Sequence, residues 1–271
     1  MTKKEYKRVM TIAGSDPSGG AGLQADIKTI SACGCFATSA VVAVVDENTV
    51  GVTGVHPIPA AFVAGQIHSI LDDIGTDSIK IGMLHSSELI QTVRDTLDKY
   101  PDIKDIVLDP VMVATSGVAL LQSDATATLR DVLIPRSRVI TQNIPEAEIL
   151  LGRRIAEDDE LPDAARELAS LGASVFLKAG HLIGDTLTDI FYNAETDEII
   201  RMSSPRISTK NTHGTGCTLS SAMASFLAIG HSLNDAALLA KDYISKAIAA
   251  GSEYTIGHGN GPVHHFHALW T

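Results

Sequence analysis

The sequence predicts an α/β protein, a three-layer α/β/α sandwich around a mostly parallel central sheet. Short apolar runs alternate with stretches of helical periodicity along most of the 271 residues, a pattern typical of parallel strands joined by right-handed helical crossovers. Apolar residues make up 45% of the chain and aromatic residues only 4%, so an aliphatic core suits a sheet covered by helices on both faces. Because no linker or internal repeat interrupts the pattern, we expect residues 1–271 to form a single domain.

In the first half of the chain, strands are expected where short apolar runs end in turn residues. The run 8–13 ends at Gly14, and the helix that follows, 21–32, has apolar residues at helical spacing. Pro59 marks the start of a second helix, whose apolar stripe extends over 62–74. The other elements expected here are strands at 39–45, 52–55, 78–81 and 105–108, and a serine-capped helix at 87–99.

In the second half, the alternation of strands and helices continues and then ends in two long helices. An acidic run at 157–160 is interpreted as the solvated start of a helix over 161–171. Two strand-like segments, 186–192 and 198–202, are close enough in sequence to pair as a hairpin. The other elements expected are strands at 138–141 and 174–177, and helices at 125–133, 216–228 and 233–251.

Charge and cysteine content restrict the partners and the compartment. The formal net charge is −11, which argues against nucleic acid or a membrane as a partner, because either needs a basic surface. The apolar run from Val9 to Ala13 is too short for a signal-peptide core or a membrane span. Cys33, Cys35 and Cys217 form neither a disulfide framework nor a CxxC pair, so we expect a cytoplasmic protein.

A glycine-rich loop lies directly before the helix expected at 216–228. Gly214, Thr215 and Gly216 let the backbone approach a ligand closely, and the free N–H groups of a helix start favour anions. Cys217 would lie in the first turn, where the same field favours the thiolate, a candidate general base toward a substrate hydroxyl. A glycine-rich helix cap with a buried cysteine explains the spacing equally well.

A second glycine-rich stretch, residues 14–22, follows the first strand. It has neither the Walker lysine nor the GxGxxG spacing, but a loop there can enclose a substrate at the carboxyl edge of the sheet. An ordinary turn is the alternative. Asp26 falls one helical turn beyond the stretch, and its alternative interpretation is an exposed helix residue.

Polar residues also follow three of the later strands. Asp109 comes after the strand 105–108, and Asn143 and Glu146 come after the strand that ends at Thr141. Carboxylates at this edge could hold Mg²⁺ beside phosphates, although helix capping by Asn143 and a surface position for Glu146 remain open. Lys178 ends a strand and could contact phosphate, or could simply be solvated.

The C-terminal segment 261–267 contains three histidines. Without cysteine partners or paired HxxxH spacing, a metal site there is disfavoured. We expect a terminal segment that docks on the rest of the protein.

Taken together, these motifs resemble the hydroxymethylpyrimidine/phosphomethylpyrimidine kinases of the ribokinase superfamily, over nearly the whole chain. The segments that carry the resemblance are 11–22, 80–84, 107–112, 143–147, 211–220 and 261–267. The resemblance implies a ribokinase-like fold, usually dimeric, with ATP as co-substrate and Mg²⁺ as cofactor. It further implies two successive phosphorylations, which convert 4-amino-5-hydroxymethyl-2-methylpyrimidine to its monophosphate and then to its diphosphate for thiamine diphosphate synthesis.

The resemblance also assigns roles to individual residues. The loop Gly214, Thr215, Gly216 and Cys217 would hold the phosphoryl group, with Cys217 as the candidate base. The residues implied at the pyrimidine are Gly14, Ala21, Asp26, Glu47, Met83 and Val111. Those implied at ATP are Lys178, Asn143 and Thr212, and those at Mg²⁺ are Asp109 and Glu146.

One position departs from the family pattern. Where the family commonly has Ala-Gln-Asn-Thr, this chain has Asp46-Glu47-Asn48-Thr49. A glutamine offers a donor and an acceptor to the aminopyrimidine edge, whereas an ionised Glu47 can only accept. Glu47 must therefore be protonated, face a protonated ring or bind the amine alone, and burial would favour the first option. A pyridoxal/pyridoxine kinase is the nearest alternative function, and a non-catalytic ligand-binding sensor on the same fold is a more distant one.

Overall fold

The central element of the structure is an eight-stranded sheet. The computed structural model describes residues 4–112, 121–122, 124–180 and 184–270. The strand order is β10-β9-β8-β7-β6-β5-β1-β2. The six strands from β8 to the edge strand β2 run parallel to one another, whereas β9 pairs antiparallel with both β8 and β10. The strands are β1 (Arg8–Ala13), β2 (Phe36–Val41), β5 (Ser78–Ile81), β6 (Ile106–Leu108), β7 (Val139–Asn143), β8 (Ser174–Lys178), β9 (Thr186–Asn193) and β10 (Glu198–Pro205).

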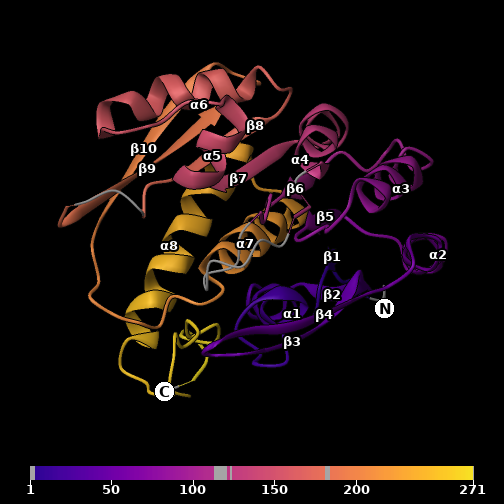
Figure 1. Ribbon diagram of the computed structural model, residues 1–271, viewed down its shortest axis with the longest axis horizontal. Coiled ribbons are helices and arrows are strands. Elements are labelled where there is room, and N and C mark those ends of the chain that lie inside the picture. Colours follow the sequence, from indigo (N-terminus) through magenta and orange to yellow (C-terminus); the bar gives the residue numbers. More distant parts are fainter. Residues whose placement is uncertain (1–3, 113–120, 123, 181–183, 271) are drawn as a thin grey trace.

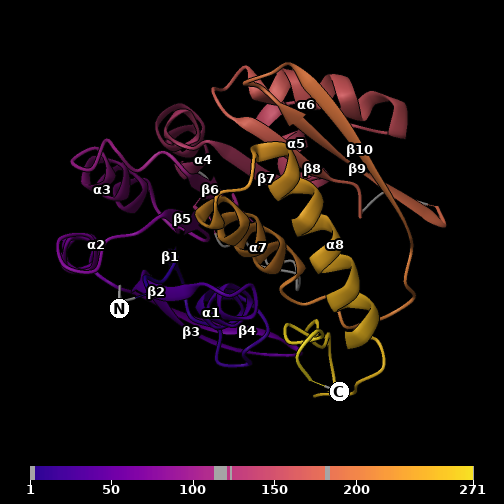
Figure 2. The same cartoon turned by 180° about the vertical axis from the view of Figure 1, so that it is seen from behind.

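Helices cover the sheet on both sides (Figures 1 and 2). One layer contains α1 (Gly22–Ala32), α7 (Thr215–Ile229) and α8 (Leu233–Gly251), with α7 packed against α1, α8 and the strands β1, β5 and β6. The opposite layer contains α2 (Ala60–Leu71), α3 (Ser87–Leu97), α4 (Ala125–Thr128), α5 (Ile144–Leu151) and α6 (Leu161–Ala169). The predicted three-layer α/β/α sandwich with a mostly parallel sheet is confirmed.

The two layers enclose two separate apolar cores. Along β1, Met10 and Ile12 belong to the core beneath α2, α3, α5 and α6, while Val9 belongs to the core beneath α7 and α8. Both faces of the strand are therefore buried, which is why its sequence is continuously apolar rather than alternating. The polar Thr11 lies on the α7 side and is fully buried, so its hydroxyl needs a partner there.

The expected strand at 39–45 is wrong in one respect. The chain leaves the large sheet after β2, and β3 (Ala43–Asn48) pairs with β4 (Gly51–Pro57) as a separate antiparallel arm. The backbone of the β1–α1 loop takes part in the change, because the Ser15 N–H donates to the Ala43 carbonyl at 2.9 Å. An apolar run alone does not indicate that its first part pairs with β1 in the large sheet and its second part with β4.

The helix α5 follows from the alternative interpretation of Asn143 as a helix cap, not from the apolar pattern. Asn143 caps it, and the Glu146 side chain returns a bond to the Asn143 N–H, with Pro145 in the first turn. An N-cap asparagine followed three residues later by glutamate is a capping-box signature, so the signal for this helix was present in the sequence.

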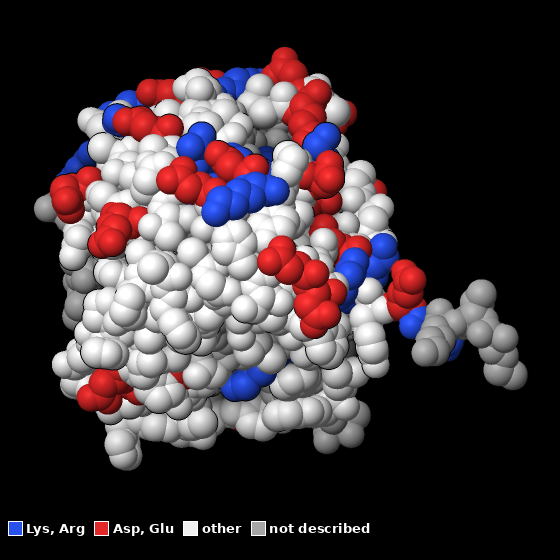
Figure 3. Space-filling view, turned by 90° about the vertical axis from the view of Figure 1, so that its right-hand side faces the viewer, with Lys and Arg blue, Asp and Glu red and all other residues white. Residues whose placement is uncertain are grey.

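The surface in Figure 3 is the right-hand side of Figure 1, where α2 lies. Most of the lysine and arginine side chains drawn there lie beside aspartates and glutamates, and a broad uncharged area occupies the middle of the face. None of the described helices combines the length and the apolar character needed to cross a bilayer.

Candidate active site

The site is built where the parallel strands end. Asp109 follows β6, Asn143 ends β7 and Lys178 ends β8, so all three lie at the carboxyl edge of the sheet, where open α/β sheets bind their ligands. The start of α7 reaches the same edge. A Cβ atom built on Gly216 would lie 3.2 Å from the Lys178 Nζ and 3.3 Å from the Asp109 Oδ2.

The two glycine-rich segments are in direct contact. Gly214, the residue before α7, has φ 76°, a left-handed conformation that favours glycine. A Cβ there would lie 1.8 Å from the carbonyl oxygen of Gly20, so a side chain cannot be accommodated without moving the β1–α1 loop. Glycine at 214 is therefore required both by its conformation and by this close approach.

Cys217 lies between two helix starts. It is in the first turn of α7, and the N–H of Gly22, the first residue of α1, acts to lower the pKa of its thiol. The expected preference for the thiolate is wrong for the free protein, since burial raises the pKa of Cys217 to about 12. The Lys80 cation lowers the pKa, but Asp26 and Asp109 raise it, so loss of hydration outweighs the field of the helices.

A buried ion pair lies behind Cys217. The Lys80 Nζ is 2.9 Å from the Asp26 Oδ2, and both side chains are completely inaccessible to solvent. Asp26 also accepts hydrogen bonds from Thr11 Oγ1 at 2.6 Å and from Ser221 Oγ at 2.8 Å. Ser221 is four residues after Cys217, on the same face of α7, so the pair supports the first turns of this helix.

Sequence reasoning missed Lys80 and allowed Asp26 to be an exposed helix residue, which is wrong. Burial acts to lower the pKa of Lys80, but the Asp26 carboxylate more than compensates and holds it above its usual value. The three donors Thr11, Lys80 and Ser221 converge on Asp26 in the protein interior.

A second cluster surrounds Asp109 on the other side of the α7 start. The Lys178 Nζ and the Thr141 Oγ1 each lie 3.2 Å from the Asp109 Oδ1. Glu146 is also buried, so a surface position for it is wrong, whereas capping by Asn143 is confirmed. Burial raises the pKa of Glu146 to about 7, opposed by Lys178 and reinforced by Asp109.

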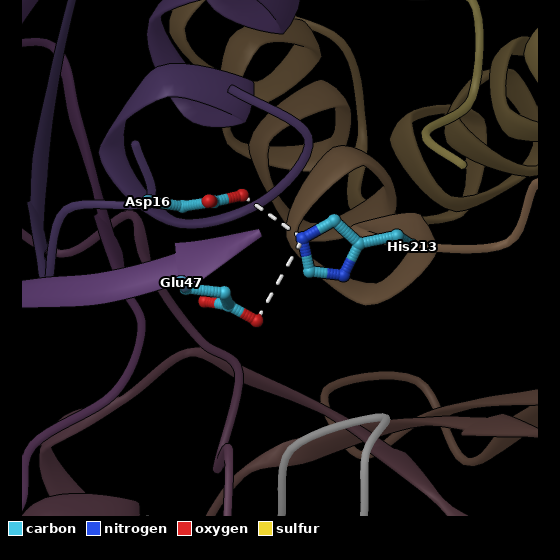
Figure 4. Close-up of side chains that lie close together, drawn as sticks. All are labelled: Asp16, Glu47 and His213. Carbon is cyan, nitrogen blue, oxygen red and sulfur yellow. Dashed lines mark hydrogen bonds and ion pairs between the residues drawn. The ribbon is translucent and has the colours of Figure 1, made fainter. Parts of the chain in front are cut away.

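Glu47 lies in a third cluster, with two residues that were not predicted as site residues (Figure 4). The His213 Nε2 is 2.9 Å from the Asp16 Oδ2 and 3.9 Å from the Glu47 Oε1. The Asp16 carboxylate also accepts the backbone N–H groups of Ser18, Gly20 and Ala21, at 2.8, 3.0 and 2.6 Å. With its oxygens so occupied, Asp16 organises the β1–α1 loop and joins it to the segment before α7.

The electrostatics of this third cluster favour a cationic His213. Despite its burial, hydrogen bonding to Asp16 raises the pKa of His213, and Glu47 adds to the effect. The pKa of Asp16 is held well below its usual range, because the hydrogen bonds from His213, Ser18 and Ala21 outweigh the cost of burial. Burial and the Asp16 charge raise the pKa of Glu47, in the direction expected from the sequence.

The remaining predicted residues fall into two groups. Gly14 and Met83 are neighbours, since a Cβ on Gly14 would lie 2.8 Å from the Met83 Cε, and Ala21 is anchored to Asp16. Val111 instead packs at the edge of the large core, and the Thr212 side chain is exposed. No hydrogen bond within the described part of the chain connects either of these two to Cys217.

The expected docking of the C-terminal segment is confirmed. The His213 N–H donates to the Gly261 carbonyl at 3.0 Å, and the backbones of His213 and Pro262 form an isolated parallel β-bridge. The segment also holds the β3–β4 turn, since the Asn260 N–H donates to the Thr49 carbonyl at 2.8 Å. The C-terminal residues thus position the arm that carries Glu47.

Comparisons with known proteins agree with this geometry. The family model described as phosphomethylpyrimidine kinase matches residues 16–264. The hydroxymethylpyrimidine/phosphomethylpyrimidine kinase of Rhizobium meliloti is 45% identical to this chain, and the match covers 96% of this chain and 97% of the relative. The enzyme of the same name from Escherichia coli is 44% identical, and the match covers 96% of this chain and 98% of the relative. A Bacillus subtilis pyridoxal kinase solved as an ADP complex has TM-score 0.89 and 33% identity, covering 98% of this chain and all of its own. A phosphomethylpyrimidine kinase from Clostridium difficile has TM-score 0.78 and 40% identity, covering 89% and 99%. The chain therefore belongs to the hydroxymethylpyrimidine/phosphomethylpyrimidine kinase family, within the ribokinase-like fold.

Proposed function

We propose that this chain transfers phosphate from ATP to the hydroxymethyl group of 4-amino-5-hydroxymethyl-2-methylpyrimidine, and then to the resulting monophosphate, in thiamine diphosphate biosynthesis. The relatives named for these two kinase activities support the substrates, and neighbours solved with ADP and AMP-PCP support the nucleotide. The observation that carries the proposal is the position of the start of α7. It lies between the ion pair of Lys178 with Asp109 on one side and the β1–α1 loop that contains Asp16 on the other.

In this proposal the residues of the α7 start act on the phosphoryl group in transit. The N–H groups of Gly214, Gly216 and Cys217, which donate to no acceptor among the described residues, stabilise its charge, as helix starts do for anions. Lys178 neutralises the nucleotide side. Cys217 accepts the proton of the acceptor hydroxyl, which requires the small thiolate fraction that its raised pKa permits.

Mg²⁺ is proposed at Asp109 and Glu146, and the donor set fits it. Both groups supply carboxylate oxygens, the ligands that Mg²⁺ prefers. The Asp109 Oδ2 faces Gly216 and accepts no hydrogen bond from the described residues, and the Glu146 Oε1 has only a long contact of 3.4 Å to the Met112 N–H. The ion would neutralise phosphate charge at this edge of the site.

The raised pKa of Glu146 makes a prediction about stability. The folded-state pKa of about 7 lies above the ordinary 4.5, so folding favours the protonated form and stability falls as pH rises through this window. A shift of this size corresponds to about 3 kcal/mol. We expect the Glu146→Gln variant not to show this loss of stability at high pH. The check is denaturant unfolding of both proteins without metal, at about pH 5 and about pH 8.

The exposed Glu253→Gln variant is the matched control, and it should retain the wild-type pH dependence. Equal pH dependence of unfolding for the Glu146→Gln and wild-type proteins would show that Glu146 ionises freely in the folded state.

We further propose that residues 1–271 form one kinase domain that assembles as a homodimer. Exposed aromatic rings of Phe36 on the edge strand β2 and Phe62 on α2, 45% and 66% accessible, support an interface on that side. Sedimentation equilibrium tests the assembly, and a monomer at assay concentration contradicts it.

Substrate preference is the direct test of the proposed function. Pyridoxal is the second candidate substrate, because pyridoxal kinases are similar to this chain in structure. We expect the kcat/KM measured from initial ADP release to be at least about tenfold higher for the pyrimidine alcohol than for pyridoxal. A clear preference for pyridoxal would replace the proposal, and ligand-induced thermal stabilisation without any turnover would favour a sensor.

A further inference from the structure

Glu47 differs from the other acidic residues of the site in its hydrogen bonding. Asp16, Asp26, Asp109 and Glu146 each accept hydrogen bonds from protein donors. Within the described ranges of the chain, no donor bonds the Glu47 carboxylate, and the His213 Nε2, at 3.9 Å, is beyond hydrogen-bond distance. Its side chain is only 14% accessible, so it is a largely buried acceptor that the protein itself leaves unsatisfied.

The charges around Glu47 do not compensate it. The His213 Nε2, from the segment before α7, is hydrogen-bonded to Asp16 at 2.9 Å and gives Glu47 no hydrogen bond. Behind His213, burial lowers the pKa of His265 to about 4, so that imidazole adds no positive charge at neutral pH. On the neighbouring strand β4, the partner of Glu47 is the apolar Val52. In the free protein, an ionised Glu47 therefore lacks both a hydrogen-bond donor and a compensating charge.

We propose that Glu47 is a specificity-determining residue that binds the substrate ring through one proton shared between its carboxylate and the ring nitrogen next to the amine. The inference rests on the proposed function, because it takes the aminopyrimidine edge of the substrate to face Glu47. The amine donates to one carboxylate oxygen, and the shared proton joins the other oxygen to the ring nitrogen.

The proton balance follows from the hydrogen-bonding groups. A carboxylate and the ring nitrogen are both acceptors, and two buried acceptors facing each other would lose a hydrogen bond and repel. One proton taken from solvent on binding satisfies both, whether it resides on the oxygen or on the nitrogen. The complex then contains one proton more than the free protein and the free ring, and no covalent bond between heavy atoms changes.

A glutamine at this position supplies its own N–H to the ring nitrogen and needs no proton. The wild-type protein should therefore bind the ring less tightly as pH rises, by up to about tenfold per pH unit above the pKa values involved. A Glu47→Gln variant should bind it with little dependence on pH. A ring that keeps the amine but has carbon in place of the adjacent nitrogen should lose this contact in the wild type.

Isothermal titration calorimetry of the full chain with 4-amino-5-hydroxymethyl-2-methylpyrimidine, in two buffers of different ionisation enthalpy at about pH 8.5, tests the proposal. Uptake of about one proton per bound ring is expected for the wild type and about none for Glu47→Gln. The matched control is Asp46→Asn, which removes a charge from the exposed preceding residue and should keep the wild-type uptake.

Binding and turnover of the ring without proton uptake, or with equal uptake in the wild type and Glu47→Gln, would overturn the shared proton alone and leave the kinase function intact. A ring that neither binds the wild type nor is phosphorylated would overturn both. The two failures are distinguished by the same titration and a turnover assay.

Discussion

Replacing Cys217 with alanine should slow the first phosphorylation by about 10² to 10⁴ and the second by much less. The first acceptor is an alcohol that must lose a proton, whereas the second is a phosphate that is already anionic. Burial holds the pKa of Cys217 near 12, so the thiolate fraction grows with pH. The first step of the wild type should therefore accelerate between about pH 7 and about pH 9, while the second stays nearly constant. Rapid-quench measurement of each step with purified acceptors checks both expectations.

Cys35→Ala is the matched control, because Cys35 lies in the second core and its thiol points to the Ser225 carbonyl, at 3.7 Å. Its ratio of first-step to second-step rate should equal that of the wild type. Equal losses in both steps for Cys217→Ala would mean that the cysteine packs or shapes the helix start and takes no proton.

Replacing Lys80 with methionine should lower the free energy of unfolding by about 3 to 5 kcal/mol, the cost of leaving a buried charge without its partner. Asp26 would then be completely buried with only the hydroxyls of Thr11 and Ser221 as donors. Because Ser221 lies on the Cys217 face of α7, we expect the kinase activity of the surviving folded fraction to fall as well. Chemical denaturation measures the stability loss.

The matched control is Lys246→Met, which breaks an exposed lysine–aspartate pair with Asp242 on α8 and should cost at most about 0.5 kcal/mol. The double variant Lys80→Met/Asp26→Leu should recover part of the loss, because it removes both charges. If Lys80→Met is as stable as Lys246→Met, the buried pair does not anchor α7.

Much of the fold could be predicted because local patterns determine it. The strands β1 and β5 and the helix α8 begin and end where the apolar patterns place them. Asp109 and Lys178 could be placed at one edge because parallel strands end together. The exchange of partners between β2 and β3 could not be predicted, since it depends on the β1–α1 loop.

The interior of the site was harder to predict than its edge. Lys80 lies within an apolar run and gives no sign of its partner, which is 54 residues earlier in the chain. The Asp16–His213 pair joins residues 197 positions apart, a distance at which a single sequence contains no information on contact. The pKa of Cys217 was expected in the wrong direction, because the field of a helix start is visible in the sequence and the loss of hydration is not.

The most direct test of the account is a crystal structure of this protein with the pyrimidine alcohol and a non-hydrolysable ATP analogue. The account predicts the terminal phosphate at the N–H groups of Gly214 to Cys217, with the substrate hydroxyl between that phosphate and the Cys217 sulfur. A terminal phosphate bound away from the start of α7, or a hydroxyl out of hydrogen-bond reach of Cys217, would contradict it.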